Sequence, residues 1–491
     1  MSIENPKQFI SKLIEKNILV EKQALETITS LFEKNKILAK HVAENICNSN
    51  FTSLTDKIVK EKINLLGKKT EEKISVKKTH LKIRADYEGR LSLRKIKDND
   101  IKKNADNFCN YFSSRYEKIK KILQSHLDIN NLISIANIKS TPKSRQISVI
   151  GIVGEITNAK TGTIIFEIED KTDAIKVFAK DPDLCKNLIS DEVVAVNGVV
   201  FNNCILAKKI IFPEIPTPTK INKIKEPLKA VFISDIHIGS KQYLHNIEDK
   251  FLNWINKDKQ TDSVKYLFIA GDNVDGVGIY PSQKQELQID DIYKQYSLFE
   301  DFIEKIPDEI EIVICPGNHD AVMQFEPQFA LDKVYVPNLI NLSNIHLVKN
   351  PQYVYLNSDV EDYGLNVLMY HGYSFTKIIN EIPVLRKKGI GCPEYVMIET
   401  LKKRHLAPIY GSSIINPLKE DYLVIDQIPD IFQTGDLHSH CMKNYKGITL
   451  ISSSTFQGQT SFMNKIGHIA NPGKVSIVDL HTREIFIKNF Y

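Results

Sequence analysis

The stretch EIVICPGNHD, residues 311–320, runs from an apolar strand into a cluster of polar side chains. Pro316 and Gly317 are typical of the turn that ends such a strand. The turn itself does not require an Asn, a His and an Asp in succession at Asn318, His319 and Asp320. One such cluster could belong to an ordinary turn, so its meaning depends on whether other strands end in the same way.

Four other apolar segments of this chain also end in Asp or His. The residues that follow them are Asp235 and His237 after 229–234, Asp272 after 266–270, His371 after 365–370, and Asp436, His438 and His440 after 431–434. Amphipathic segments lie between these strands, at 251–257 and 296–306. Such alternation predicts a layered α/β domain. The carboxyl ends of strands in such a sheet share one rim, where ligands bind, so we expect these side chains to meet there.

The predicted cluster is a set of metal ligands. Carboxylate, imidazole and amide oxygen without thiolate suit Mn²⁺, Fe²⁺ or Zn²⁺. The set exceeds the needs of one ion, which favours two ions about 3.5–4 Å apart, the arrangement used in phosphate ester cleavage. Each motif alone has an ordinary explanation, but five in order favour the metal site. The remaining histidines lack this context and are predicted to be ordinary: His41, His80, His126, His245, His346, His405, His468 and His481.

The composition is that of a globular intracellular protein. The 491 residues predict two to four domains, and 42% hydrophobic and 25% charged residues are common values. Seven scattered cysteines without a C-x-x-C pair exclude a zinc ribbon and fit reduced thiols. The N-terminus has no signal-peptide core, and no apolar run is long enough to span a membrane. We therefore expect a cytoplasmic protein without membrane contact.

The periodicity of the chain predicts five regions. Apolar residues at three- and four-residue spacing predict a helical N-terminal domain over 1–55. A Lys-rich segment over 56–110 is predicted as a basic linker that is either simply solvated or in contact with nucleic acid. A connecting helix is expected over 111–136. Five short strands over 137–218 predict an all-β barrel of the oligonucleotide-binding (OB) type. The α/β domain with the polar strand ends is expected over 225–491.

Several motifs resemble those of the small subunit of the archaeal family D DNA polymerase. The motifs are SDIHIGS (234–240), GDNVDGVGIYPSQ (271–283), PGNHDAV (316–322), RHLAPIYG (404–411) and SSTFQGQT (453–460). That family belongs to the calcineurin-like metallophosphoesterase superfamily, in the branch of the double-strand-break repair nuclease. A barrel directly before the phosphoesterase domain follows the order of the same family. The resemblance covers roughly 137–491 and says little about 1–110.

The resemblance implies a role for each matching residue. Asp235 and His237 would hold the first ion, Asp272 would bridge both ions, and Asn318 and His371 would hold the second ion. His319 would be catalytic, placed over the scissile phosphate to stabilise charge or to protonate the leaving 3′ oxygen. Asp320 would orient His319 or cap the following helix.

The last motif departs from the family pattern Gly-His-x-His. A reading without gaps from Gly435 replaces the first histidine by Asp436 and keeps His438. Then His438 would serve the first ion and Asp436 the second. The other register uses His438 for the second ion and His440 for the first. We favour the first register, which would place an added carboxylate at the second ion and weaken proofreading.

The resemblance implies a 3′→5′ exonuclease that proofreads within a replicative DNA polymerase. Two divalent ions are expected, Mn²⁺ first, with Mg²⁺, Fe²⁺ or Zn²⁺ as alternatives. The expected partners are a large catalytic subunit and the primer 3′ end of DNA, with a sliding clamp as a further candidate. A second hypothesis is a non-catalytic accessory B-subunit that serves as a scaffold and keeps a residual metal site. A third, a general phosphatase or cyclic-nucleotide phosphodiesterase, fits the attached barrel less well.

Overall fold

The computed structural model describes residues 6–16, 18–34, 39, 42–43, 46–47, 53–63, 91–96, 105–357, 364–465 and 467–491. The chain divides into two units, Met1–Tyr87 and Glu88–Tyr491, and each is a separate body. Among the residues described, no helix combines the length and the apolar character needed to cross a membrane.

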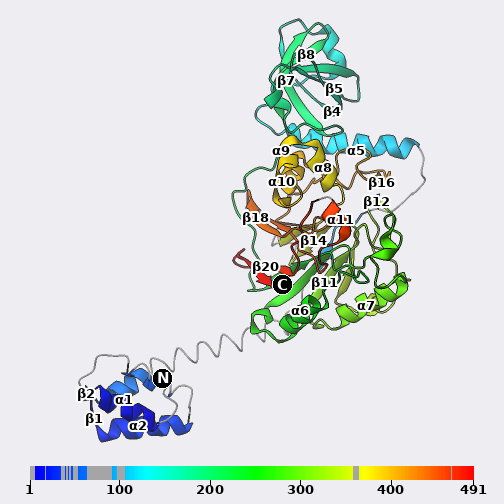
Figure 1. The fold of residues 1–491 in the computed structure, drawn as a ribbon. Coiled ribbons are helices and arrows are strands. Elements are labelled where there is room, and N and C mark those ends of the chain that lie inside the picture. Colours follow the sequence, from blue (N-terminus) through cyan, green and yellow to red (C-terminus); the bar gives the residue numbers. More distant parts are fainter. Residues whose placement is uncertain are drawn as a thin grey trace. The chain divides into compact units, whose positions relative to one another are not determined.

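The first unit contains two amphipathic helices, α1 (Pro6–Glu15) and α2 (Lys22–Lys34), drawn in blue in Figure 1. Phe9 and Leu13 of α1 and Ile28 of α2 are buried in one core. Strands β1 (Leu19–Val20) and β2 (Ser53–Leu54) pair in parallel beside them. The helices lie where the apolar spacing predicts them, but a helical domain reaching residue 55 remains a prediction.

Five strands of the second unit close into a barrel. They are β4 (Gln146–Asn158), β5 (Ile164–Glu169), β6 (Ala174–Ala179), β7 (Val193–Phe201) and β8 (Cys204–Ile211), joined in the order β4-β5-β6-β8-β7. Val149, Phe166 and Val194 fill its core because alternate residues of a strand face the same side. The five predicted strands and their closure are confirmed (Figure 1), whereas assignment to the OB class stays a prediction.

Two six-stranded sheets form the α/β domain within the described residues. The first has the order β13-β11-β10-β9-β20-β21, and its strands are β9 (Lys229–Ile233), β10 (Val264–Ala270), β11 (Glu311–Cys315), β13 (Ile345–Leu347), β20 (Lys474–Asp479) and β21 (Ile485–Asn489). The second has the order β18-β19-β17-β15-β14-β3, and its strands are β3 (Leu91–Leu93), β14 (Gln352–Leu356), β15 (Leu365–Met369), β17 (Ile431–Thr434), β18 (Cys441–Tyr445) and β19 (Ile448–Ser452). Strands β9, β10 and β11 run parallel, as do β15, β17 and β19.

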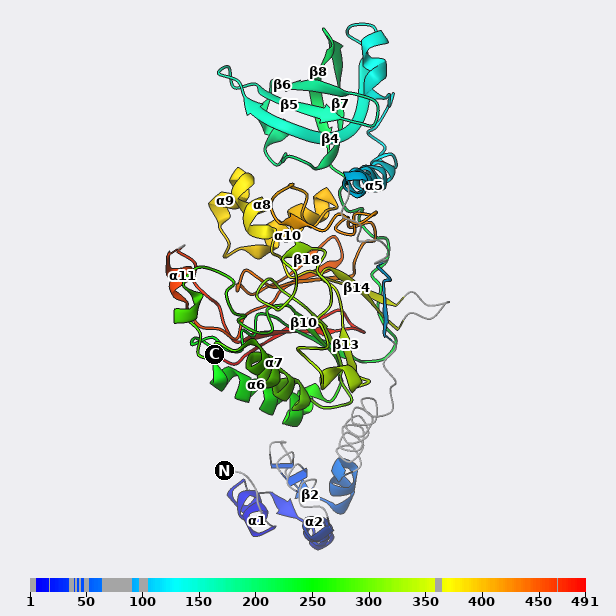
Figure 2. The ribbon, with the colours of Figure 1, turned by 90° about the vertical axis from the view of Figure 1, so that its right-hand side faces the viewer.

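The sheets face one another and carry helices on their outer sides. Gln433 of β17 donates to the carbonyls of Ile233 and Phe268, which joins the second sheet to the first. Helices α6 (His245–Lys257) and α7 (Ile292–Glu304) pack on the first sheet, with Phe251 and Phe299 in the core. Helices α8 (Phe375–Glu381), α9 (Pro383–Lys388) and α10 (Pro393–Lys403) contribute to the core of the second sheet. Figure 2 shows the two helix groups on opposite sides of the strands.

The structure differs from the predicted linker and connecting helix. Helix α5 spans Ala105–Leu123, so it begins before residue 111 and ends well before 136. Strand β3 lies within the predicted linker and pairs with β14. Nη1 and Nη2 of Arg94, the residue after β3, each donate to one carboxylate oxygen of Asp426 at 2.6 Å, which anchors this strand. A three-residue strand has too little periodicity to be predicted, because only its distant partner defines it.

A buried polar cluster joins α5 to the α/β domain. Arg115 is fully buried and its Nε donates to Asp421 Oδ2 at 2.8 Å. His405 Nε2 donates to the same oxygen at 2.8 Å, and its Nδ1 accepts from the amide of Ala407 at 3.1 Å. Because Nδ1 already accepts a hydrogen bond, this imidazole is held neutral. Burial and the nearby Arg115 lower the pKa of His405 to about 4.

Candidate metal and phosphodiester site

Side chains from both sheets converge at the strand ends. Asp235 and His237 follow β9, Asp272 and Asp275 follow β10, Asn318 and His319 follow β11, His371 follows β15, and Asp436 and His438 follow β17. Parallel strands place their carboxyl ends at one rim, so residues distant in the sequence become neighbours. Three overlapping groups from this set have side-chain nitrogen and oxygen atoms within 4.8 Å of one another.

Five of these residues have left-handed backbone conformations. Their φ angles are 52° for Asp235, 54° for His237, 50° for Asp272, 62° for Asp436 and 49° for His438. A non-glycine residue with positive φ is uncommon, and each costs of order 1–3 kcal/mol. Such conformations persist where the surrounding structure enforces them, and they cluster at functional sites. The backbone turns sharply after β9, β10 and β17, and after β9 and β17 it directs both polar side chains of a D-x-H pattern into one site.

The first group is formed by Asp235, His237 and His438. His438 Nε2 lies 3.2 Å from Asp235 Oδ1 and 3.1 Å from His237 Nε2. Asp235 and His237 are almost completely buried. The carboxylate of Asp235 also accepts hydrogen bonds from the Ser234 hydroxyl and from the amide of Asp436 at 3.1 and 3.2 Å. These contacts fix the carboxylate beside the two imidazoles.

A second set of side-chain donors surrounds His371. Its Nδ1 donates to the carbonyl of Ala270 at 2.7 Å, so Nε2 faces the site. Nε2 lies 3.0 Å from Asn318 Oδ1, 3.3 Å from Asp272 Oδ2 and 3.8 Å from Asp436 Oδ1. Burial raises the pKa of Asp436 to about 6.

Asp272 lies between His237 of the first group and His371 of the second set. Its Oδ2 is 3.6 Å from His237 Nε2 and 3.3 Å from His371 Nε2. Its Oδ1 accepts from the amide of His319 at 2.8 Å. Burial acts to raise the pKa of Asp272, but the imidazoles of His371 and His319 outweigh it and hold that pKa below its usual value.

His319 is partly exposed, with 17% of its side chain accessible. Its Nδ1 donates to the backbone carbonyl of Asp275 at 2.8 Å, which leaves Nε2 for a ligand. Its ring centroid is 4.8 Å from that of His237. Burial acts to lower the pKa of His319, but the carboxylates of Asp272 and Asp275 reverse this, so the pKa lies above its ordinary value.

Asp275 is a residue that the sequence analysis did not assign. Its Oδ1 accepts from His237 Nδ1 at 3.0 Å and from Gln457 Nε2 at 3.1 Å. Its backbone carbonyl orients His319. A carboxylate that accepts from a histidine N–H is the usual support of a metal-binding imidazole, because it directs the other nitrogen toward the ion. The signal was present in the sequence as the second Asp of GDNVDG.

Asp320 has a different role from both that were expected. Its Oδ2 accepts from the amide of Gly317 at 2.8 Å and from the side chain of Asn273 at 2.9 Å, and Oδ1 accepts from the hydroxyl of Tyr296 at 3.0 Å. No contact with His319 appears among its hydrogen bonds in the described residues, and no helix follows it directly. Asp320 therefore braces the loops after β10 and β11, and burial raises its pKa to about 6.

The structure places His440 apart from the cluster. Its Nε2 bonds to the hydroxyl of Ser476 on β20 at 2.9 Å. The three groups of metal donors among the described residues include His438 but neither His440 nor Asp436, whose Oδ1 lies 3.8 Å from His371 Nε2. Asp436 and His438 both point to the site, which is the geometry of the first register. The contact with Ser476 could not be predicted because it joins segments that are distant in the sequence.

Gly271 lets the loops approach one another closely. Its φ is +88°, and a Cβ there would lie 2.6 Å from His371 Nδ1 and 2.8 Å from Gly317 Cα. Both distances are too short for a side chain, so any larger residue would displace His371 or the loop after β11. The glycine before Asp272 is thus required by the packing of the site.

A cavity of about 440 Å³ opens over the cluster. His237, Asp272, Asn318, His319, Asp436 and His438 line its polar side. Tyr280, Tyr373, Phe462 and Met463 line it as well. His468, predicted to be ordinary, is buried at its wall with Nε2 lacking a hydrogen-bond partner in the described residues. Polar and aromatic surfaces in one cavity match a ligand with a charged and an apolar part.

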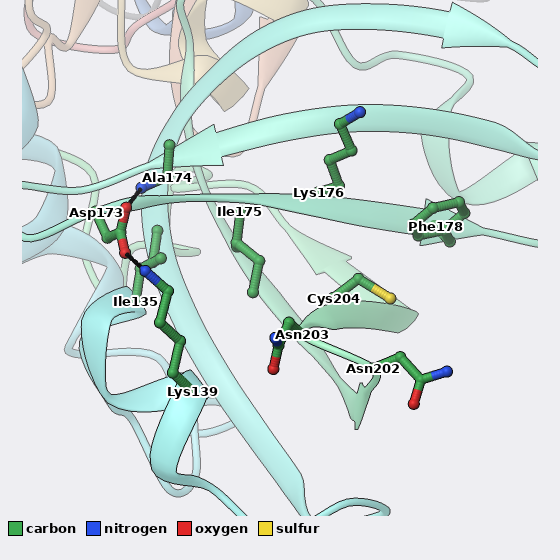
Figure 3. Close-up of a pocket in the computed structure, with 10 residues that line it drawn as sticks. All are labelled: Ile135, Lys139, Asp173, Ala174, Ile175, Lys176, Phe178, Asn202, Asn203 and Cys204. Atoms are coloured by element: carbon green, nitrogen blue, oxygen red, sulfur yellow. Dashed lines mark hydrogen bonds and ion pairs between the residues drawn. The ribbon is translucent and has the colours of Figure 1, made fainter.

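A second cavity of about 320 Å³ lies on the barrel (Figure 3). Lys139 and Asp173 form an ion pair of 2.6 Å at its edge. Asn202 and Asn203 in the turn between β7 and β8 and the Lys176 side chain also line it. None of the predicted site residues belongs to this cavity.

The donor set of the larger cavity fits divalent metal ions. Histidine nitrogens and carboxylate oxygens, donors of hard or intermediate character, are clustered in these groups, and Mn²⁺, Fe²⁺ and Zn²⁺ all bind such a set. His237 donates its Nδ1 proton to Asp275 and His371 donates its Nδ1 proton to a backbone carbonyl, so the Nε2 atoms of both rings face inward. Ring nitrogens and carboxylate oxygens directed at one space are the donors of a cation site.

Comparisons with known proteins show which family the chain resembles over its length. A family model described as the B subunit of DNA polymerase alpha/epsilon matches residues 230–443. The DNA polymerase II small subunit of Archaeoglobus fulgidus is 34% identical over 481 residues, which cover 95% of this chain and 92% of that protein. The protein of the same name from Thermoplasma acidophilum is 33% identical, covering 94% and 93% of the two chains. That from Methanothermobacter thermautotrophicus is 36% identical, covering 75% and 76%.

The identities exceed 30% over nearly the whole length of two relatives, and the family resemblance in the motifs is thereby confirmed. The chain belongs to the family of the archaeal DNA polymerase II small subunits, the small subunits of family D DNA polymerases.

Proposed function

We propose that the chain is the 3′→5′ exonuclease subunit of a replicative DNA polymerase, and that it removes nucleotides from the primer 3′ end. The observation that carries this proposal is the buried group of carboxylate, imidazole and amide donors at five strand ends, centred on Asp272. Family membership supports the polymerase context. The partners are a large catalytic subunit and a DNA 3′ end, with a sliding clamp as a further partner.

The proposed ligands divide between two ions. Asp235, His237 and His438 hold the first ion, and Asn318, His371 and Asp436 hold the second, as their mutual distances favour. Asp272 bridges them because its carboxylate lies between His237 and His371. Divalent ions, Mn²⁺ being the first candidate, would supply an activated water and polarise the phosphate.

His319 acts at the leaving group. Its Nδ1 proton is held by the carbonyl of Asp275, so a protonated His319 presents Nε2–H to the cavity. The carboxylates of Asp272 and Asp275 raise its pKa, which favours the protonated form near neutral pH. From there His319 binds a phosphate oxygen or donates a proton to the departing 3′ oxygen.

The test is digestion of a primer with a mismatched 3′ terminus in the presence of Mn²⁺. The wild-type chain, alone and with its large subunit, is compared with His319→Ala and Asp272→Asn. His245→Ala and Asp249→Asn change the same residue types at exposed positions of α6 and serve as controls. We expect digestion by the wild type and the controls and strong loss in both site variants. No digestion by the wild type in either form would overturn the proposal.

A non-catalytic accessory subunit is the second candidate. Asp436 favours this candidate, because the family pattern Gly-His-x-His has a neutral imidazole at the position of this carboxylate. Burial raises the pKa of Asp436 to about 6, so this carboxylate is costly to charge without a cation beside it. In that case the chain would still bind the large subunit and raise its polymerase activity, while Asp272→Asn would change neither property.

A further inference from the structure

The rim of the site cavity carries aromatic rings. Phe462 of α11 (Ser461–Lys465) lines the cavity with 56% of its surface exposed. Tyr280, from the loop after β10, lies beside it, with ring centroids 6.3 Å apart and planes inclined by 31°. The Tyr280 ring is 6.1 Å from the ring of His319. A continuous row of rings thus runs from the polar cluster to the surface.

The two aromatic residues are held in place by Glu286. Its Oε2 accepts from the hydroxyl of Tyr280 at 3.3 Å, and its Oε1 accepts from the hydroxyl of Ser461. Ser461 directly precedes Phe462, so the Glu286 carboxylate links the loop after β10 to α11 through two hydrogen bonds.

The same loop is also fastened to the site. Gln283 accepts from the amide of Ile279 at 2.9 Å and donates to the backbone carbonyl of Asp275 at 2.8 Å. That carbonyl also receives His319 Nδ1. The position of Tyr280 is therefore coupled to the position of His319. Hydrogen bonds thus hold the two aromatic rings in defined positions beside the site.

The exposed Phe462 ring and the partly buried Tyr280 ring, beside the proposed phosphate-binding centre, suit the base of a nucleotide. Stacking on an aromatic face accepts every base, because each has a π-face, and it needs no sequence readout. A base within a duplex is already paired and stacked, whereas an unpaired terminal base is free to move onto another surface. A ring pair at this place would therefore favour ends that are not base-paired.

We propose that Tyr280 and Phe462 form a stacking platform for the base of the terminal nucleotide, and that this platform selects unpaired 3′ ends for cleavage. This inference rests on the proposed exonuclease function and names its substrate-positioning residues. The phosphodiester lies at the Asp and His cluster while the base lies on the two rings.

The test compares two single-stranded oligonucleotides that differ only in the last nucleotide, which is normal in one and abasic in the other. The full chain, alone and with its large subunit, is assayed as wild type, Phe462→Ala, Phe462→Trp and Tyr280→Ala. Phe201→Ala removes a ring that is 50% exposed on the barrel and is the matched control. Cleavage rates and equilibrium binding by fluorescence anisotropy are both measured.

We expect Phe462→Ala and Tyr280→Ala to weaken binding and cleavage of the normal end by roughly 5- to 150-fold, the range for loss of one base–aromatic stack. The abasic end should lose far less, and Phe462→Trp should behave like the wild type. Equal losses for both ends would overturn the platform and point to a purely structural role of the rings.

Failure of the exonuclease proposal would look different. If the wild type cleaves neither oligonucleotide, the proposed function is wrong, and the anisotropy measurement alone decides on the platform. A preference for the normal end that disappears in Phe462→Ala would then support base stacking by a non-catalytic subunit. Equal binding of both ends by the wild type would overturn it.

Discussion

The variant Asp275→Ala tests whether the hydrogen bond from His237 to the Asp275 carboxylate is needed for metal binding. The Asp275 carboxylate is buried and accepts from His237 Nδ1 at 3.0 Å and from Gln457 at 3.1 Å. Without it, His237 and Gln457 lose an acceptor, at a cost of about 1–3 kcal/mol each, and Gln283 loses a longer contact of 3.5 Å. Gln457 keeps its bond to Ser240 at 2.8 Å, so His237 loses more.

The expected magnitude follows from the role of an acceptor behind a metal ligand. Loss of such an acceptor typically lowers metal affinity or activity by about 10- to 100-fold. Asp275→Asn keeps an oxygen that can accept from His237 and should lose less than the alanine variant. The backbone carbonyl that orients His319 remains in both. Both variants also remove the carboxylate charge that helps to raise the pKa of His319, so the Mn²⁺ affinity, rather than the exonuclease rate, isolates the effect on His237.

The assay is calorimetric titration of the full chain with Mn²⁺, followed by the exonuclease assay at saturating Mn²⁺. Asp249→Ala, which removes an exposed carboxylate from α6, is the control for the change in charge. We expect the affinity order wild type, Asp275→Asn, Asp275→Ala, with the control equal to the wild type. Unchanged Mn²⁺ affinity in Asp275→Ala would refute the assignment of Asp275 as the support of a metal-binding histidine.

Three other predictions concern the proposed acid, the altered motif and pH. His319→Ala should reduce the exonuclease rate by about 10²- to 10⁴-fold while calorimetry shows Mn²⁺ still bound; a rate near that of the wild type would exclude it as the acid. Asp436→His, which restores the family motif, should raise the exonuclease rate, and a fall would show that the carboxylate is the better ligand. His405 has a folded pKa of about 4 against 6.5 unfolded, so the unfolded chain binds the extra proton. Its contribution, about 3 kcal/mol, is present above pH 6.5 and lost as the pH falls toward 4. Urea unfolding between pH 7.5 and 4.5 should show this loss, and His405→Gln, but not the exposed His245→Gln, should reduce it.

The sequence determined where polar residues follow apolar strands. Five apolar segments with polar ends are visible in the order of residues, because strands and turns have short-range signatures. The five barrel strands were predictable for the same reason. The sequence accordingly predicted that Asp235, Asp272, Asn318 and His371 meet at one rim with the neighbouring His319, and the structure brings them together, while their roles as ligands stay a prediction.

Only the tertiary structure decided which partner each of these polar residues contacts. Asp275 and Asp320 both follow a strand, yet Asp275 supports His237 whereas Asp320 braces loops. The difference arises from backbone turns and from partners on other segments, which no local pattern encodes. The aromatic rim is a similar case, since Glu286 joins Tyr280 to α11 across a long stretch of sequence.

The last motif shows the same division most clearly. The residues Asp436, His438 and His440 could be read in two registers: one kept the spacing from Gly435 with an Asp in place of the first histidine, and the other kept the two histidines but shifted them away from Gly435. Left-handed φ angles at Asp436 and His438 direct these side chains to the site, while His440 forms a hydrogen bond with Ser476 of β20 instead. The sequence alone determined that ligands stand at this strand end. Only the packing of two sheets decided which of them reach the site, because a side chain's direction depends on backbone geometry and on long-range contacts.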